Sequence, residues 1–388
     1  MEGDTPALSM LASRPRKRPR TESFDADADA TLIEEPASVK VVRDPVYYNP
    51  SGDCKIRVDD TLFCVHRFLL ERDSSTFQTM FQLPQGVSQP QGSTDEDPIV
   101  LVGDTVAQFR ALCWALYALP DEIVKESTAK DSIEKLTEVA TISHKYQLAA
   151  FQSWSMGSIR QHCQGMRSSE SDGRFHPYLN ICPPHLLPLF LRLSVLYGED
   201  ALLSRVVSAW VSRLGTTSPS SPCYLPVSAF STALQSGEEN HLREFLGRLY
   251  YVRLQVAHST PSHSVPLTEL PFQELEPRHL QRILRGSYLL STTWQNIISS
   301  IPELSRDSKC YQHYTCVPEW NKLWAEASTK GGAADVHCKL DWVSAHLHSG
   351  LDGSAKIAPS CADKGKGIVE NLIKQMKQVL PGYFLGPP

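Results

Sequence analysis

A hairpin-like pattern between Cys54 and Val65 most narrows the folds open to this chain. Its first half alternates apolar with charged residues, which is the period of a strand with one buried face. The apolar positions of this half are Cys54, Ile56 and Val58. Two aspartates at 59–60 favour a turn, and Thr61 to Val65 continues as a second, more uniformly apolar strand. The sequence therefore predicts a β-hairpin whose first strand is half-buried.

Helical patterns follow the hairpin. Two short helices are expected next, and a polar loop from Leu83 to Pro98 then leads to a third strand at Ile99 to Val102. Thr105 and Gln108 have the spacing of a capping box, at the start of a helix whose apolar stripe must face a core. A later helix is expected from about Leu148 to Cys163.

The run from Phe63 to Phe81 resembles the signature of BTB/POZ domains, in which a strand ends in Phe-x-Ala/Val-His before two helices with fixed apolar positions. The matching positions are Phe63, Val65, His66, Leu70, Ser74, Phe77, Met80 and Phe81. Further blocks beginning at Ile99, Phe109 and Leu136 follow in the family's order. The resemblance spans about a third of the chain, and the loop before the third strand is similar to that of BTB proteins abundant in mushroom-forming (basidiomycete) fungi.

This resemblance implies the fold class and the function. The expected fold is an α+β BTB/POZ domain, a small sheet of three or more strands flanked by helical hairpins, followed by a mainly α-helical C-terminal domain. Relatives form homodimers or dock partners without catalysis; many are cullin ubiquitin-ligase substrate adaptors and others recruit transcriptional corepressors. We therefore expect a non-enzymatic protein–protein interaction module that binds itself and other proteins, with a cullin scaffold as one candidate partner. The expected contact residues are Phe68, Leu69, Gln82 and Leu83.

Two alternatives remain open at this point. One is a nuclear transcriptional or chromatin regulator that recruits cofactors. Five cations within seven residues near the N-terminus would then act as a nuclear import signal, although a solvated charge run has the same composition. These cations are Arg14, Arg16, Lys17, Arg18 and Arg20. The other alternative is a zinc-binding or enzymatic C-terminal half.

The length of 388 residues exceeds what one core usually supports, so two folded domains with tails are expected. We predict a disordered tail at 1–42, a BTB/POZ domain at 44–163, a polar linker at 164–183, a helical domain at 184–380 and a tail at 381–388. The helices predicted in the second half are Pro184 to Leu214, Val227 to Leu254, Pro277 to Ser299, Val317 to Ser328 and Val369 to Val379.

Composition indicates the cellular compartment in which we expect the protein. Ten irregularly spaced cysteines favour a reducing compartment, and no apolar run is long enough for a membrane span. The net charge of -5 does not favour unselective nucleic-acid binding. We therefore expect an intracellular protein of the nucleus, the cytoplasm or both.

Three residues are weak candidates for a metal site. Cys310, His313 and Cys316 have C-x2-H-x2-C spacing, and His337 and Cys338 follow downstream. A tetrahedral zinc site needs four such ligands, and this spacing matches no familiar zinc finger. A loop with free thiols and no cofactor is therefore the expectation, with zinc as the alternative.

Other chemically capable residues are interpreted as structural. His66 has no nucleophile arranged beside it, and no phosphate-binding glycine motif occurs, so neither catalysis nor a small-molecule substrate is expected. Trp320 and Trp324 lie four residues apart, on one helical face, and are expected to pack onto the helical domain.

Overall fold

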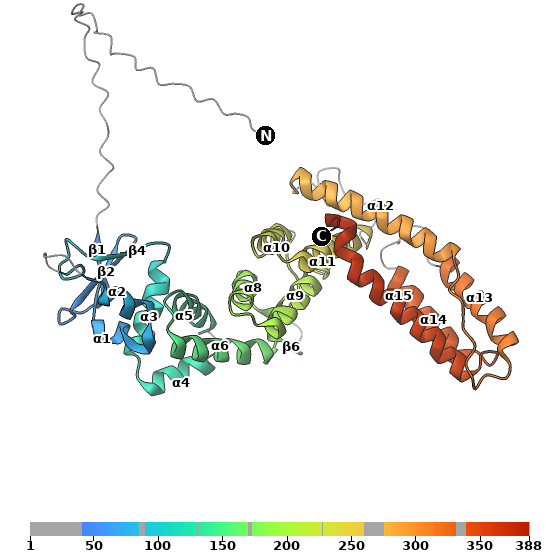
Figure 1. Ribbon diagram of the computed structural model, residues 1–388, viewed down its shortest axis with the longest axis horizontal. Coiled ribbons are helices and arrows are strands. Elements are labelled where there is room, and N and C mark those ends of the chain that lie inside the picture. The colour runs from blue at the N-terminus through green and yellow to red at the C-terminus, as the bar shows by residue number, and fades with distance from the viewer. Residues whose placement is uncertain are drawn as a thin grey trace, which may run out of the picture. The chain divides into compact units, whose positions relative to one another are not determined.

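The computed structural model describes most of the chain after residue 40. The described residues are 41–84, 90–129, 132–169, 173–226, 228–259, 275–330 and 339–387. The basic cluster from Arg14 to Arg20 lies outside them, as do His337 and Cys338. The described structure is mixed α/β, mostly helical with a small sheet (Figure 1).

The main sheet has four strands in the order β1-β3-β2-β4. They are β1 (Val42–Tyr48), β2 (Cys54–Val58), β3 (Thr61–Val65) and β4 (Ile99–Leu101). The predicted hairpin is confirmed, because β2 and β3 pair antiparallel with Ile56 opposite Phe63. Strand β1 runs parallel to β3, and β4 runs parallel to β2. The predicted third strand is therefore part of the sheet, whereas β1 was not predicted.

Helices pack against the sheet and against one another. They are α1 (Arg67–Leu70), the 3-10 turn η1 (Arg72–Ser74), α2 (Thr76–Gln82), α3 (Val106–Tyr117), α4 (Pro120–Thr128), α5 (Ile133–Lys145) and α6 (Ala149–Gln164). Phe63 and Phe109 meet edge to face at 4.8 Å in the core, where both are fully buried. The predicted capping box is present: Thr105 Oγ1 accepts from Gln108 N (3.2 Å), and Gln108 Oε1 accepts from Thr105 N (3.0 Å).

The described residues of the segment 164–183, expected to be a polar linker, are folded and partly buried. It contains β5 (Met166–Ser168), β6 (Phe175–Pro177) and α7 (Tyr178–Ile181). Tyr178 and Leu179 are buried in a core that also takes in Leu136 and Ile159 from the expected BTB/POZ segment. Packing is therefore continuous across the expected domain boundary, because apolar side chains follow the polar stretch directly.

The middle of the chain is helical, with more breaks than predicted. Its helices are α8 (Leu186–Leu196), α9 (Asp200–Leu214), α10 (Ser228–Glu239), α11 (Arg243–Ser259) and α12 (Pro277–Ser299). The helix predicted from 184 to 214 is divided at Gly198, which adopts a positive φ of 65°. The helix predicted from 227 to 254 is divided at His241, with a φ of 54°. The bounds of α12 match the prediction.

Three C-terminal helices, α13 (His313–Lys330), α14 (Lys339–Gly353) and α15 (Pro359–Leu385), complete the fold (Figure 1). Trp320 and Trp324 are buried in a core between them, which confirms that this helical face packs inward. The expected tail at 381–388 is wrong, because α15 continues to residue 385 and Phe384 is fully buried against Tyr250. None of the helices in the described part of the chain is long and apolar enough to cross a membrane.

Candidate functional site

The expected contact residues lie on α1 and at the end of α2. Phe68 is 63% exposed and Leu83 is 58% exposed, and Gln82 is also exposed. Leu69 differs from the expectation because it is partly buried and packs against the core of the α/β unit. The described surface therefore offers Phe68, Gln82 and Leu83 to a partner, whereas Leu69 contributes to the core.

Hydrogen bonds hold this surface in a fixed geometry. The N–H of Arg67 donates to Asp53 Oδ1 (2.7 Å), and its guanidinium donates to Phe81 O (2.9 Å). The second bond links the start of α1, which carries Phe68, to the end of α2, which carries Gln82 and is followed by Leu83. We name Phe68, Gln82 and Leu83 the α1–α2 surface.

Charges of both signs lie around the α1–α2 surface. Arg67 Nε donates to Glu71 Oε1 (2.8 Å), and Asp53, Arg72 and Asp73 are exposed nearby. An exposed ion pair such as that of Arg67 and Glu71 contributes only about 0–1 kcal/mol to stability. The mixture of signs limits the electrostatic repulsion between two copies of this surface.

His66 ends β3 and is tied to α3. Its Nδ1 lies 2.8 Å from Tyr117 Oη, and its backbone N–H donates to the same oxygen (2.9 Å). Ser51 Oγ is 3.4 Å from the other ring nitrogen, and both residues are solvent-accessible. The histidine thus joins the sheet to a covering helix by hydrogen bonds that any neutral imidazole can make.

Two buried carboxylates in the α/β unit are each paired with a cation. Asp44 accepts from Arg110 Nε (2.6 Å), and Asp104 accepts from Lys145 Nζ (2.7 Å). Burial opposes the charge of Asp44, but backbone hydrogen bonds and the Arg110 contact lower the pKa of its carboxyl overall. Asp104 also accepts from Tyr146 Oη, and burial together with this contact raises the pKa of the phenol. Each carboxylate is held by a cation and by further hydrogen-bond donors, the arrangement of a structural ion pair.

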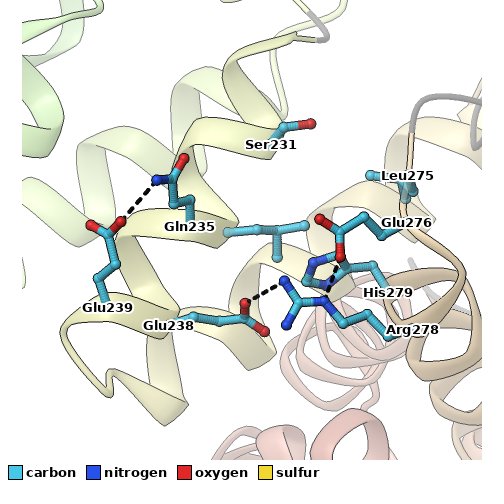
Figure 2. Close-up of a pocket in the computed structure, with 9 residues that line it drawn as sticks. Ser231, Gln235, Glu238, Glu239, Leu275, Glu276, Arg278 and His279 are labelled. Atoms are coloured by element: carbon cyan, nitrogen blue, oxygen red, sulfur yellow. Dashed lines mark hydrogen bonds and ion pairs between the residues drawn. The ribbon is translucent and has the colours of Figure 1, made fainter. Parts of the chain in front are cut away.

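A hollow of about 460 Å³ lies between α10 and the start of α12 (Figure 2). Its lining is mostly polar, and Figure 2 shows Glu238 and Arg278 pointing toward one another across it. Glu238 pairs with Arg278 (3.1 Å) and with Arg282 (2.7 Å). Burial opposes ionisation, yet these two cations lower the pKa of Glu238. The acid is therefore held as a carboxylate between two guanidinium groups and is not poised as a general acid.

His279, on the wall of the same hollow, belongs to a hydrogen-bond network with Tyr250 and Arg282. Arg282 Nη1 donates to Tyr250 Oη (3.0 Å), and the same oxygen lies 2.8 Å from His279 Nδ1. Burial lowers the pKa of His279, which agrees with a neutral ring. This network joins α10, α11 and α12, and it places no nucleophile beside a base.

The three weak metal candidates are brought together, and a fourth residue joins them. Cys310, His313, Cys316 and Cys361 each offer a ligand atom, and all four atoms lie within 4.8 Å of one another. The three cysteines are buried and His313 is partly exposed. His313 and Cys316 stand in the first turn of α13 and not in a loop as expected, while Cys361 comes from the first turn of α15. Sequence spacing could not identify Cys361, because it lies far along the chain from the other three.

No family model matches the chain, and no curated protein or solved structure gives a significant match. A functional proposal for this chain therefore depends on the residues and contacts described above.

Proposed function

We propose that the chain is a protein-interaction adaptor that self-associates through its α/β unit, residues 42–164, in the manner of the BTB/POZ domains it resembles. The observation that carries the proposal is the exposure of Phe68 and Leu83 on a surface held rigid by hydrogen bonds. Large apolar side chains gathered on a rigid surface are typical of interaction sites. The role we propose is binding, without catalysis.

The order of elements supports the resemblance. A strand pair is followed by two short helical segments, a strand parallel to β2, and then the helices α3, α5 and α6. The resemblance implies the same order: hairpin, paired helices, third strand and later helices. We propose that residues 42–164 have the BTB/POZ fold.

We propose a second copy of this chain as the occupant of the α1–α2 surface. A two-fold dimer brings the same patch of both copies together, so the patch must be complementary to itself. An apolar centre at Phe68 and Leu83 meets this requirement, and the neighbouring Arg67 is already paired with Glu71 within one copy. Gln82 can exchange amide hydrogen bonds with its own symmetry mate.

Co-capture of two differently tagged copies tests this proposal. The wild-type chain with one tag should retain the second tag after washing, and the double variant Phe68→Ser/Leu83→Ser should lose at least about 90% of it. Removing an apolar anchor from an interface costs about 1–2 kcal/mol, and each 1.4 kcal/mol is about tenfold in affinity.

Phe175→Ser is the matched control, because Phe175 is 70% exposed on β6 and lies outside the α1–α2 surface. It should co-capture as the wild type does. Undiminished co-capture by the double variant would show that the copies meet elsewhere, and no co-capture by the wild-type chain would show that they do not meet.

For the cellular partner we propose a cullin ubiquitin-ligase scaffold, as in many proteins that the α/β unit resembles. Binding of the purified chain to a recombinant cullin amino-terminal domain would support this. Intact self-association without cullin binding would instead favour the nuclear regulator. In that case, alanine substitution of all five cations from Arg14 to Arg20 should reduce nuclear accumulation.

A further inference from the structure

The cluster of Cys310, His313, Cys316 and Cys361 has the dimensions of a metal site. Cys310 Sγ and Cys316 Sγ are 3.8 Å apart, and Cys361 Sγ is 3.6 Å from His313 Nδ1. A zinc ion binds thiolate sulfur at about 2.3 Å and imidazole nitrogen at about 2.0–2.1 Å in a tetrahedron. These bond lengths place two sulfur ligands about 3.8 Å apart, and a sulfur and a nitrogen about 3.6 Å apart. Both measured distances agree with tetrahedral coordination.

A disulfide fits this cluster less well. A disulfide bond joins its sulfurs at about 2.05 Å and uses two residues, which would leave the third thiol and the imidazole without a role. The separation of 3.8 Å between Cys310 and Cys316 is well beyond that bond length. A shared ion would give a role to all four groups, whose ligand atoms lie within 4.8 Å of one another.

The surroundings favour thiolates. Cys316 and Cys361 each lie in the first turn of a helix of more than eight residues, where the helix dipole stabilises negative charge. The backbone N–H of Ala358 donates to Cys316 Sγ (3.3 Å). The guanidinium of Arg306 donates to Cys310 O (3.2 Å), which places a cation beside the cluster. Three thiolates and one divalent ion leave a single net negative charge, which these donors and the cation offset.

A bound metal would remove the thiol protons, because coordination deprotonates a thiol outright.

We propose that Cys310, His313, Cys316 and Cys361 bind one zinc ion that holds the C-terminal helical unit together. Four protein ligands close the coordination sphere, which makes the site structural and leaves no open position for catalysis. The ligands join the irregular segment before α13, the first turn of α13 and the first turn of α15. Cys310, Cys316 and Cys361 also belong to the core that contains Trp320 and Trp324, so the ion would lie at the edge of that core.

Elemental analysis of the purified full chain tests the site directly. After incubation with zinc and removal of unbound metal, wild-type protein should contain about one zinc per chain. His313→Ala should lose most of it, and His313→Cys, which restores a thiolate ligand, should retain it. His313 is partly exposed, so these two variants remove or replace a ligand without opening a cavity in the core.

Cys163→Ser is the matched control, because Cys163 is a buried free thiol outside the cluster. It should bind as much zinc as the wild type. A second readout uses metal-stripped wild-type protein titrated with cobalt(II), which should develop the visible absorption of a tetrahedral thiolate site that zinc then abolishes.

Three results would overturn the proposal. One is less than about a third of a zinc ion per wild-type chain. Another is equal zinc content in wild type and His313→Ala. The third is a disulfide between Cys310 and Cys316 in a peptide map prepared without reductant from freshly purified protein.

Discussion

Asp44 joins β1 to the rest of the α/β unit and allows a quantitative test of that packing. Its side chain is fully buried, and Oδ1 accepts from the backbone N–H groups of Val46 (3.0 Å) and Tyr47 (2.8 Å). Oδ2 accepts from Arg110 Nε on α3 (2.6 Å). The carboxylate is therefore the acceptor for three donors, two of them on the strand itself.

Asp44→Ala should lower the free energy of unfolding by about 3 kcal/mol. Breaking a buried ion pair by removing one partner costs about 3–5 kcal/mol. The lower end of this energy range applies because the Arg110 side chain is 48% exposed and can be hydrated when its partner is lost. Asp44→Asn retains an oxygen for the backbone donors and loses the charge, so its cost should be about half as large, roughly 1.5 kcal/mol.

Urea unfolding followed by intrinsic fluorescence measures these changes. Asp121→Ala is the control, because Asp121 is 64% exposed and its ion pair with Lys125 spans 3.2 Å on the surface of α4. Its effect should stay within about 0.5 kcal/mol of wild type. The reasoning is refuted if Asp44→Ala is no more destabilising than Asp121→Ala.

The same carboxylate predicts a pH dependence. The folded-state pKa of Asp44 lies below its ordinary value of 3.8, so the folded state favours the ionised form. Its stabilising effect is complete above the unfolded pKa and is lost as the pH falls through the lower folded value. The difference in stability between wild type and Asp44→Asn should therefore be constant near neutrality and shrink below about pH 4.

Two further perturbations test packing and thiol burial. A methyl group at Gly286 would overlap the ring of Phe384, so Gly286→Ala should lower the thermal midpoint of unfolding. Gly367, on α15, has nothing within 4 Å of the added carbon. Gly367→Ala should therefore raise the free energy of unfolding by about 0.5–1 kcal/mol. Native alkylation should modify the partly exposed Cys223 before Cys54, since burial raises the pKa of Cys54 to about 12, and a peptide map in which Cys54 reacts first would contradict this order.

Local signals predicted the elements that depend on neighbouring residues. The β2–β3 hairpin follows from alternation that begins at Cys54, and the start of α3 follows from the capping pair of Thr105 and Gln108. Strand β1 was not predicted because its sequence lacks a buried apolar position at the start. Among its first five residues only the charged Asp44 is buried, and a proline follows it. The contact between Asp44 on β1 and Arg110 on α3 joins residues that are distant in sequence, so no local sequence pattern predicts it.

The candidate sites were visible only in part for the same reason. Cys310, His313 and Cys316 are close in sequence and could be identified from spacing, whereas Cys361 reaches them only when α15 packs beside α13. Phe68 and Leu69 are equally apolar in the sequence, and the fold alone decides that the first is exposed and the second is partly buried. Residues 178–182 appeared to continue a polar linker because their burial depends on helices that follow them.

The mass of the purified chain in solution tests the central claim, self-association, most directly. One chain has a mass of 43.3 kDa. Size-exclusion chromatography with light scattering, at micromolar concentration, should give twice that mass for wild type and for Phe175→Ser. The Phe68→Ser/Leu83→Ser variant should move toward the mass of one chain. A wild-type protein with the mass of a single chain across the whole concentration range would contradict the account.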